Sequence, residues 1–232
     1  MPAFLSPAEW TAVLLSLRIA ILATLASLPF GILAAYALAR WRFPGKTLLA
    51  AALYLPLVIP PVVTGYLLLI AFGRRGIFGG MLADLGIVLA FHWTGAALAS
   101  AIMGFPLMVR AMRLSFEAID PRLEQAAGTL GANPILTFFL VSLPLAMPGI
   151  VAGATLAFAR ALGEFGATIT FVANIPGETQ TIATAIYTYI QVPGGDPAAL
   201  RLTLVAIAIA LAAVIASEII QRRGEKRLAR SA

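Results

Sequence analysis

The longest stretch without a charged residue in this chain covers residues 125–159, which is 35 residues. Stretches 19–39, 47–73 and 85–109 are also free of charge. A helix needs ~20 apolar residues to cross the ~30 Å hydrocarbon core of a bilayer, so each stretch is long enough to span it. An average soluble domain is about a quarter charged, whereas 11% of this chain is charged and 61% is hydrophobic. The sequence predicts an all-α integral membrane protein.

We expect five transmembrane helices. The final apolar run, 202–217, is shorter than the others but reaches span length if Arg201 or Glu218 lies at an interface. No internal repeat, linker or second domain is visible, so residues 1–232 are expected to form one transmembrane domain. The expected spans are 12–39, 48–72, 85–109, 136–160 and 200–220.

Lysine and arginine residues predict the orientation, because cytoplasmic loops carry an excess of them. With the N-terminus outside, eleven basic residues fall on the cytoplasmic side and four on the outer side, with Arg160 unassigned. The reverse orientation inverts the bias. We therefore expect an external N-terminus and a cytoplasmic C-terminus. The eleven cytoplasmic residues are Arg40, Arg42, Lys46, Arg110, Arg113, Arg122, Arg222, Arg223, Lys226, Arg227 and Arg230.

Several function classes are disfavoured. The net charge of +6 arises from basic residues at the ends of apolar runs, which is typical of a topology signal and not of nucleic-acid binding. The chain has one histidine, His92, and no cysteine, so a multi-histidine metal site and thiol chemistry are excluded. Gly45-Lys46-Thr47 lacks the first glycine of a P-loop, because Arg40 stands there. We expect no catalytic residue, no metal and no cofactor in this chain.

Residues 161–199 are apolar but interrupted by Glu164, Glu178, Asp196 and many glycines, prolines and threonines. Non-helical backbone at membrane depth persists only where protein or water covers it. We expect a broken or re-entrant piece, then a short helix at 182–191 on the outer face, and a loop at 193–197 before the last span.

The stretch EQAAGTLGANP, residues 124–134, is polar and lies between two apolar runs. Asp120-Pro121 is a helix start, since aspartate caps a first turn and proline suits the first position. Gly131 is a helix stop, and Asn133-Pro134 starts a second helix. Four residues spaced i, i+3, i+4, i+7 share one apolar face: Leu123, Ala126, Ala127 and Leu130. The small alanine side chains on this face allow another surface to approach closely.

Three interpretations of this short helix, 121–130, remain open. It could be a connector, a helix lying on the lipid surface, or a docking helix for a soluble partner. Few large apolar residues and mixed charge disfavour the lipid surface. The start, stop and restart favour docking, because a plain connector needs no fixed corner.

Here the sequence resembles a known family. In the membrane subunits of binding-protein-dependent ABC importers, E-A-A is followed by three residues, glycine, nine residues and I-x-L-P. This chain has Gln125-Ala126-Ala127, Gly131 and Val141-Ser142-Leu143-Pro144 at that spacing. Glutamine replaces the glutamate, with Glu124 just before it, and valine replaces isoleucine. The stretches FPGKTLL, LPLVIPPVVTGYLLLIAFGRRGIFG, RLEQAAGTLGA and ARALGEFGATITFVANIPGETQTI resemble the molybdate permeases, and ARALGEFG also the sulfate and thiosulfate permeases.

The resemblance implies the type I importer permease architecture (MetI-like), a homodimer in a bacterial cytoplasmic membrane, and molybdate import. It also implies partners: an ABC ATPase subunit that binds ATP and Mg, and an extracytoplasmic oxyanion-binding protein. Helix 121–130 would be the cytoplasmic coupling helix seated in the ATPase. The expected coupling residues are Asp120, Arg122, Leu123, Glu124, Gln125, Ala126, Ala127, Gly131 and Ala132.

Arg160 and Glu164 are four residues apart on an expected helix, so they can pair. The pair is either structural or part of a gate, since an ionisable residue within a span is a functional candidate. The resemblance places the gate near this part of the chain. The expected gate and pathway residues are Arg160, Gly163, Glu164, Gly166, Thr168 and Thr170.

Pro144 and Pro148 each remove a backbone donor early in the fourth span, and Gly149-x-x-x-Gly153 offers a small-residue surface. We expect a bent helix between the coupling helix and the pore.

The rival class is a secondary transporter or channel that needs no ATP, which five spans without a repeat disfavour. A membrane enzyme is weaker still. Within the importer class, sulfate, thiosulfate and tungstate are alternative substrates.

Overall fold

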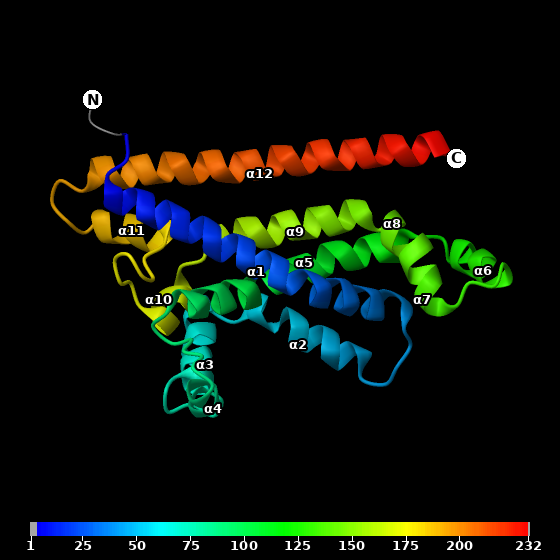
Figure 1. The fold of residues 1–232 in the computed structure, drawn as a ribbon, viewed down its shortest axis with the longest axis horizontal. Coiled ribbons are helices and arrows are strands. Elements are labelled where there is room, and N and C mark those ends of the chain that lie inside the picture. Colours follow the sequence, from blue (N-terminus) through cyan, green and yellow to red (C-terminus); the bar gives the residue numbers. More distant parts are fainter. Residues whose placement is uncertain (1–3, 232) are drawn as a thin grey trace.

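The structure is a computed structural model that describes residues 4–231, with side chains described to residue 220. Every regular element in that part is helical (Figure 1). The elements are α1 Pro7–Arg40, α2 Lys46–Val58, α3 Pro61–Phe72, α4 Gly79–Asp84, α5 Trp93–Ala118, α6 Pro121–Thr129, α7 Pro134–Thr137, the π-helical turn η1 Phe138–Ser142, α8 Leu143–Leu145, α9 Met147–Leu162, α10 Gly166–Val172, α11 Ile182–Tyr189 and α12 Asp196–Ser231.

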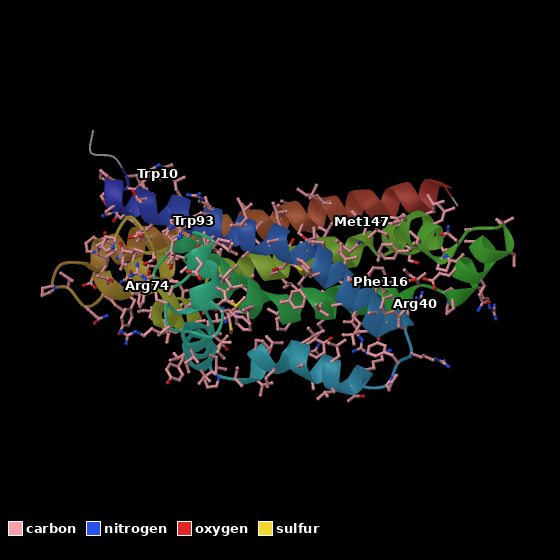
Figure 2. All side chains as sticks on the ribbon, turned by 60° about the horizontal axis from the view of Figure 1, so that its bottom comes forward. Trp10, Arg40, Arg74, Trp93, Phe116 and Met147 are labelled. Carbon is pink, nitrogen blue, oxygen red and sulfur yellow. The ribbon has the colours of Figure 1, made fainter. Side chains whose placement is uncertain are left out.

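Four long helices run side by side, with α5 packed against α1 and α9, and α12 against α9 (Figure 1). The short helices α6 and α7 lie at one end of this bundle, and α3 and α4 project from its other end. Trp10 and Trp93 lie toward the end that carries α3, whereas Arg40 and Phe116 lie toward the end that carries α6 (Figure 2).

Helices α1, α5 and the 196–220 part of α12 are long and apolar enough to cross a membrane. The expected spans 48–72 and 136–160 are each a bent pair of helices, and counting each pair as one span gives five. The α2–α3 pair is bent by 112° after Val58, where Pro60 and Pro61 follow. Proline at both positions removes two backbone donors at the break.

The third helix is displaced from the expected 85–109 and occupies Trp93–Ala118. It starts late because Gly86 has a φ of 76° and His92 caps the helix by accepting the N–H of Thr94. It ends late because charged residues do not stop a helix, whereas Pro121 holds Asp120 in extended backbone. Arg110 and Arg113 therefore lie within α5.

The α5 helix forms the centre of the core. The buried side chains Met108, Met112 and Phe116 of α5 pack with Leu38 of α1 in one apolar cluster. Small residues bring α9 close to α5: a Cβ on Gly149 would lie 2.2 Å from the Cβ of Ser115, and one on Gly153 would lie 2.8 Å from the Met108 carbonyl oxygen. The fourth span is bent by 69° between Leu145 and Met147, as expected from its prolines.

Residues 161–199 hold two short helices, α10 and α11, separated by irregular backbone. Ala173 after α10 has a φ of 64°, which is unusual for a residue with a side chain. The α11 helix, Ile182–Tyr189, lies where a short helix was expected, and a loop precedes α12. Two helices are largely uncovered by the rest of the chain. The α2 helix has no buried residue, and 11% of the most apolar 18-residue stretch of α12 is buried.

Candidate functional site

Both ends of α6 are formed by side chains and backbone close by in the sequence. Asp120 caps the helix, and its Oδ1 accepts the N–H of Arg122 at 2.9 Å, with Pro121 in the first turn. At the other end, Gly131 has a φ of 90° and donates to the carbonyl of Gly128, while Ala132 donates to Ala127. These two bonds form the Schellman arrangement, which needs a left-handed residue after the helix. The expected start and stop are confirmed.

The chain restarts two residues after Gly131. The side chain of Asn133 accepts the N–H of Leu136 at 2.8 Å and caps α7, whose first residue is Pro134. From there α7 leads through η1 and α8 into the bend before α9. The backbone from Asp120 to Pro134 is thus a fixed corner, since each helix end is capped.

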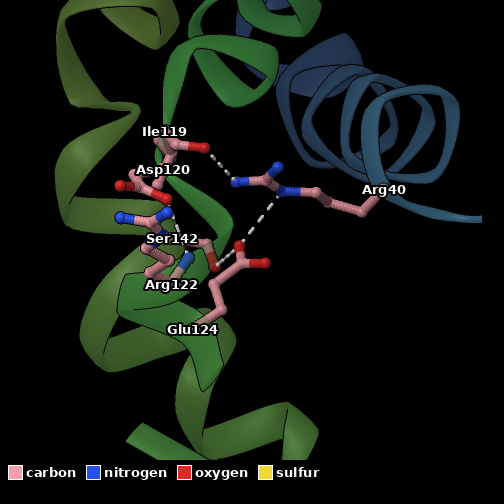
Figure 3. Close-up of polar contacts among 6 residues, drawn as sticks. All are labelled: Arg40, Ile119, Asp120, Arg122, Glu124 and Ser142. Atoms are coloured by element: carbon pink, nitrogen blue, oxygen red, sulfur yellow. Dashed lines mark hydrogen bonds and ion pairs between the residues drawn. The ribbon is translucent and has the colours of Figure 1, made fainter. Parts of the chain in front are cut away.

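Glu124 is directed toward the helical bundle (Figure 3). Its Oε1 accepts the Nε–H of Arg40 at 3.1 Å and the hydroxyl of Ser142 at 2.7 Å. Arg40 also donates to the Ile119 carbonyl at 2.8 Å. The side chains of Arg40 and Glu124 are 14% and 19% exposed, so water screens this ion pair little. The contacts tie α6 to the end of α1 and to η1.

The opposite face of α6 is open. Leu123 is 48% exposed and Leu130 is 90% exposed, and Ala126 and Gln125 are also exposed. Ala127 lies half-buried, on the side of Glu124. An exposed leucine pair separated by alanine is a low apolar surface of the kind that another protein can cover.

The remaining residues of the expected coupling set lie around this corner. Asp120 and Arg122 are exposed, and Ala132 is half-buried. Arg40 and Ser142 belong to the same cluster although the sequence interpretation did not include them. In the sequence, Arg40 fits a topology signal and Ser142 fits a motif spacing, and neither pattern predicts the contact with Glu124.

The expected gate residues lie where α9 ends and α10 begins. Arg160 Nη1 lies 2.5 Å from Glu164 Oε2, so the predicted pair forms. Glu164 is 1% exposed, and its Oε1 accepts the N–H of Ala167 at 2.8 Å. Gly163 is exposed and follows the last residue of α9.

Helix α10 crosses α3 at very short range. A Cβ on Gly65 would lie 2.5 Å from the Ala167 carbonyl oxygen, and one on Gly166 would lie 2.9 Å from Pro61. The hydroxyl of Thr170 donates to the Gly166 carbonyl, whereas Thr168 is 1% exposed and its hydroxyl has no hydrogen-bond partner. The crossing therefore holds Gly166, Thr168 and Thr170 together.

The sequence does not predict the α3 residues of this crossing, which are Thr64 and Gly65. Thr64 is 5% exposed, and its hydroxyl is also without a partner. Thr64 and Gly65 are ordinary residues of an apolar span, and only the tertiary packing distinguishes them. Among residues 4–220, no group of three or more histidine, cysteine, aspartate or glutamate side chains could hold a metal ion.

The comparisons with known proteins identify the family. The family described as binding-protein-dependent transport system inner membrane component matches residues 27–230. The chain belongs to this family. It is therefore a multi-pass inner membrane component of a transport system that depends on a binding protein, and it is not itself the ATPase.

Individual relatives match nearly the whole chain. The molybdenum transport system permease protein ModB of Escherichia coli is 58% identical over 97% of this chain and 99% of its own length. The protein of the same name from Haemophilus influenzae is 52% identical over 95% of this chain and 96% of its own length. The sulfate transport system permease protein CysT of Escherichia coli is 38% identical, covering 86% of this chain and 72% of its own length.

Solved structures share the fold. The bacterial alginate ABC transporter gives a TM-score of 0.75 at 21% identity, covering 95% of this chain and 81% of that chain. The MetNI methionine ABC transporter gives a TM-score of 0.69 at 16% identity, and the match covers 94% of both chains. At these identities the likeness concerns the fold alone. The expected all-helical fold of type I importer permeases is confirmed.

Proposed function

We propose that this chain is the membrane-spanning permease subunit of an ATP-driven importer that carries molybdate across the inner membrane. The observation that carries the proposal is the 58% identity, over 97% of the chain, to a protein named for molybdenum transport. The homologous sulfate permease is less similar, at 38% identity. Sulfate, thiosulfate and tungstate are dianions like molybdate, so their uptake is tested alongside it.

The transporter we propose contains two copies of this chain, two ATPase subunits and an external oxyanion-binding protein. ATP and Mg bind to the ATPase subunits. Each α6 is the coupling helix, and its exposed face at Leu123, Ala126 and Leu130 enters a groove of one ATPase subunit. The capped corner from Asp120 to Pro134 supports this role, because it fixes the direction of that face.

Two bonds of Glu124 supply the mechanical link in this mechanism. ATP binding brings the ATPase subunits together and moves α6. Since Glu124 binds both Arg40 and Ser142, a displacement of α6 reaches α1 and η1 directly. Helix η1 leads into the bend before α9, and α9 leads to the proposed gate at Arg160, Gly163, Glu164, Gly166, Thr168 and Thr170. Hydrolysis returns the pore to its starting state.

The test of transport is reconstitution of the chain with the candidate ATPase and binding protein in proteoliposomes. We expect uptake of labelled molybdate that requires ATP, with competition by tungstate stronger than by sulfate. Uptake without ATP would contradict the importer and support a secondary transporter. Uptake of sulfate in preference to molybdate would instead correct the substrate.

The orientation we propose has the N-terminus outside and α6 in the cytoplasm. Because the chain contains no cysteine, single cysteines introduced at Gln125 and at Gly194 would each give one labelling site. A membrane-impermeant maleimide added to intact cells should label position 194 and leave position 125 unlabelled. The reverse pattern would contradict the orientation.

A further inference from the structure

A charged cleft of about 480 Å³ lies between α2 and α5, outside the coupling and gate regions. The α2 helix contributes Tyr54 and two apolar residues, and the second half of α5 contributes the charged side chains. None of the charges belongs to the sites described above. The lining residues are Tyr54, Leu57, Val58, Arg110, Arg113, Leu114 and Glu117.

The cleft contains more positive than negative side chains. Arg113 Nε donates to Glu117 Oε1 at 2.7 Å, and these side chains are 29% and 38% exposed. Arg110 is exposed and makes no ion pair with any side chain in residues 4–220. Two guanidinium groups thus face one carboxylate, so the cleft carries one excess positive charge.

The cleft lies in the second half of α5, toward the end that meets α6 and that faces the cytoplasm in the proposed orientation. With 26 residues, α5 is ~39 Å long, whereas the hydrocarbon core is ~30 Å thick. Arg110 lies eight residues before Ala118, which is ~12 Å along the helix. Arg110 therefore lies near the cytoplasmic end of the span, and an ionisable residue within a span faces a protein interior or a water-filled cavity.

We propose that Arg110 and Arg113 form an exit site for the transported tetrahedral dianion, and that Glu117 competes with the dianion for Arg113. This inference rests on the proposed function and its orientation. A guanidinium group presents several N–H donors and can bind an oxyanion through two of them. Two such groups match the two negative charges of the oxyanion, once Glu117 releases Arg113.

The competing carboxylate makes the site suited to release. A pathway site must bind strongly enough to admit an ion and weakly enough to let it leave. Because Glu117 already neutralises Arg113, an arriving dianion replaces one ion pair of Arg113 by another. The net binding free energy of the dianion is therefore small.

Chemical protection tests occupancy directly. The reconstituted transporter is treated with phenylglyoxal, which modifies arginine, and modification is quantified by mass spectrometry with and without millimolar molybdate. We expect molybdate to slow the modification of Arg110 at least about threefold and to leave Arg42 unchanged. Arg42 is the matched control, since it is an exposed arginine of the α1–α2 loop. Equal modification of Arg110 with and without molybdate would overturn the proposal.

Substitutions test the competition. Proteoliposomes hold ATP and increasing molybdate in the lumen, on the side of the ATPase subunits, and the molybdate concentration that halves uptake is measured. Arg110→Gln and Arg113→Gln should raise this concentration about tenfold, and Glu117→Gln should lower it several-fold, while Arg42→Gln leaves it unchanged. A structural role for the cluster would shift the arginine and glutamate variants in the same direction, and that result would reject the exit site.

Failure of this inference is distinguishable from failure of the proposed function. If wild-type protein imports molybdate with ATP but the substitutions leave inhibition from the lumen unchanged, the exit site alone is wrong. If wild-type protein imports no oxyanion, the proposed function is wrong and the exit site falls with it.

Discussion

The carboxylate of Glu124 on α6 lies 3.1 Å from the guanidinium group of Arg40 at the end of α1. The same carboxylate oxygen accepts the hydroxyl of Ser142 at 2.7 Å. Glu124 thus joins three segments within the chain, and Gln125 beside it is exposed. Gln125, and not Glu124, is therefore the neighbour whose side chain is free to meet an ATPase subunit.

The Arg40–Glu124 pair should therefore affect coupling between ATP hydrolysis and transport. In purified transporter, Arg40→Gln and Glu124→Gln should each reduce molybdate uptake more than they reduce ATP hydrolysis. A double-mutant cycle on thermal unfolding should give an interaction free energy of about 1 to 2 kcal/mol, since both side chains are largely buried. Additive effects on unfolding, with uptake and hydrolysis falling equally, would argue against a mechanical link.

Gly131 should be sensitive to substitution for a conformational reason. Its φ is 90°, and a Cβ there would meet no other atom within 4 Å, so crowding plays no part. A β-branched residue in this backbone region costs about 1 to 3 kcal/mol. We expect Gly131→Val to weaken association with the ATPase subunit and to reduce uptake, measured by co-purification and transport.

Gly128→Ala is the matched control for Gly131→Val. Gly128 is also uncrowded, but its φ lies in the ordinary helical region. It should assemble and transport at near wild-type levels. Normal assembly of Gly131→Val would mean that the helix stop is dispensable for docking.

Gly149 should be sensitive for a packing reason. A Cβ there would lie 2.2 Å from the Cβ of Ser115, so Gly149→Ala forces α9 away from α5. Overpacking of this kind costs about 1 to 3 kcal/mol. Gly80→Ala, where a Cβ meets nothing within 4 Å, is the control. Fluorescence-detected size-exclusion chromatography after heating should show a lower melting temperature for Gly149→Ala alone, and equal melting would contradict the close packing.

Thr168 separates a structural role from a pathway role. Its hydroxyl is buried without a hydrogen-bond partner, and valine has nearly the same shape. Removing an unpaired buried polar group should leave stability unchanged or raise it by up to about 1 kcal/mol. If Thr168 lines the pathway, Thr168→Val should still lower uptake. Unchanged uptake in a protein of wild-type stability would remove Thr168 from the gate.

The corner at α6 was predictable from sequence because local chemistry determines it. Asp120, Pro121, Gly131 and Asn133 act on backbone groups within a few residues of themselves. The partners of Glu124 were not predictable, since Arg40 is 84 residues away in sequence and the pairing depends on tertiary packing.

The helix breaks show a second limit. Pro60 and Pro61 are visible in the sequence, but prolines are tolerated in membrane helices, so the 112° bend between α2 and α3 did not follow from them. Likewise, the end of α5 at Ala118 does not follow from the charge-free run that stops before Arg110, because a helix can continue past charged residues.

The first and last helices of the chain meet through Glu9 of α1 and Arg201 of α12, whose Nη2 donates to Glu9 Oε1 at 2.6 Å. Glu9 is 1% exposed, and its other oxygen is held by the backbone N–H of Ser6. Ribosomes add roughly 5 to 20 residues per second, and the partners are 192 residues apart, so the carboxylate precedes its arginine by roughly 10 to 40 s. Until Arg201 has been synthesised, Glu9 therefore lacks its guanidinium partner, and the N–H of Ser6 in its own helix cap is the partner of its other oxygen.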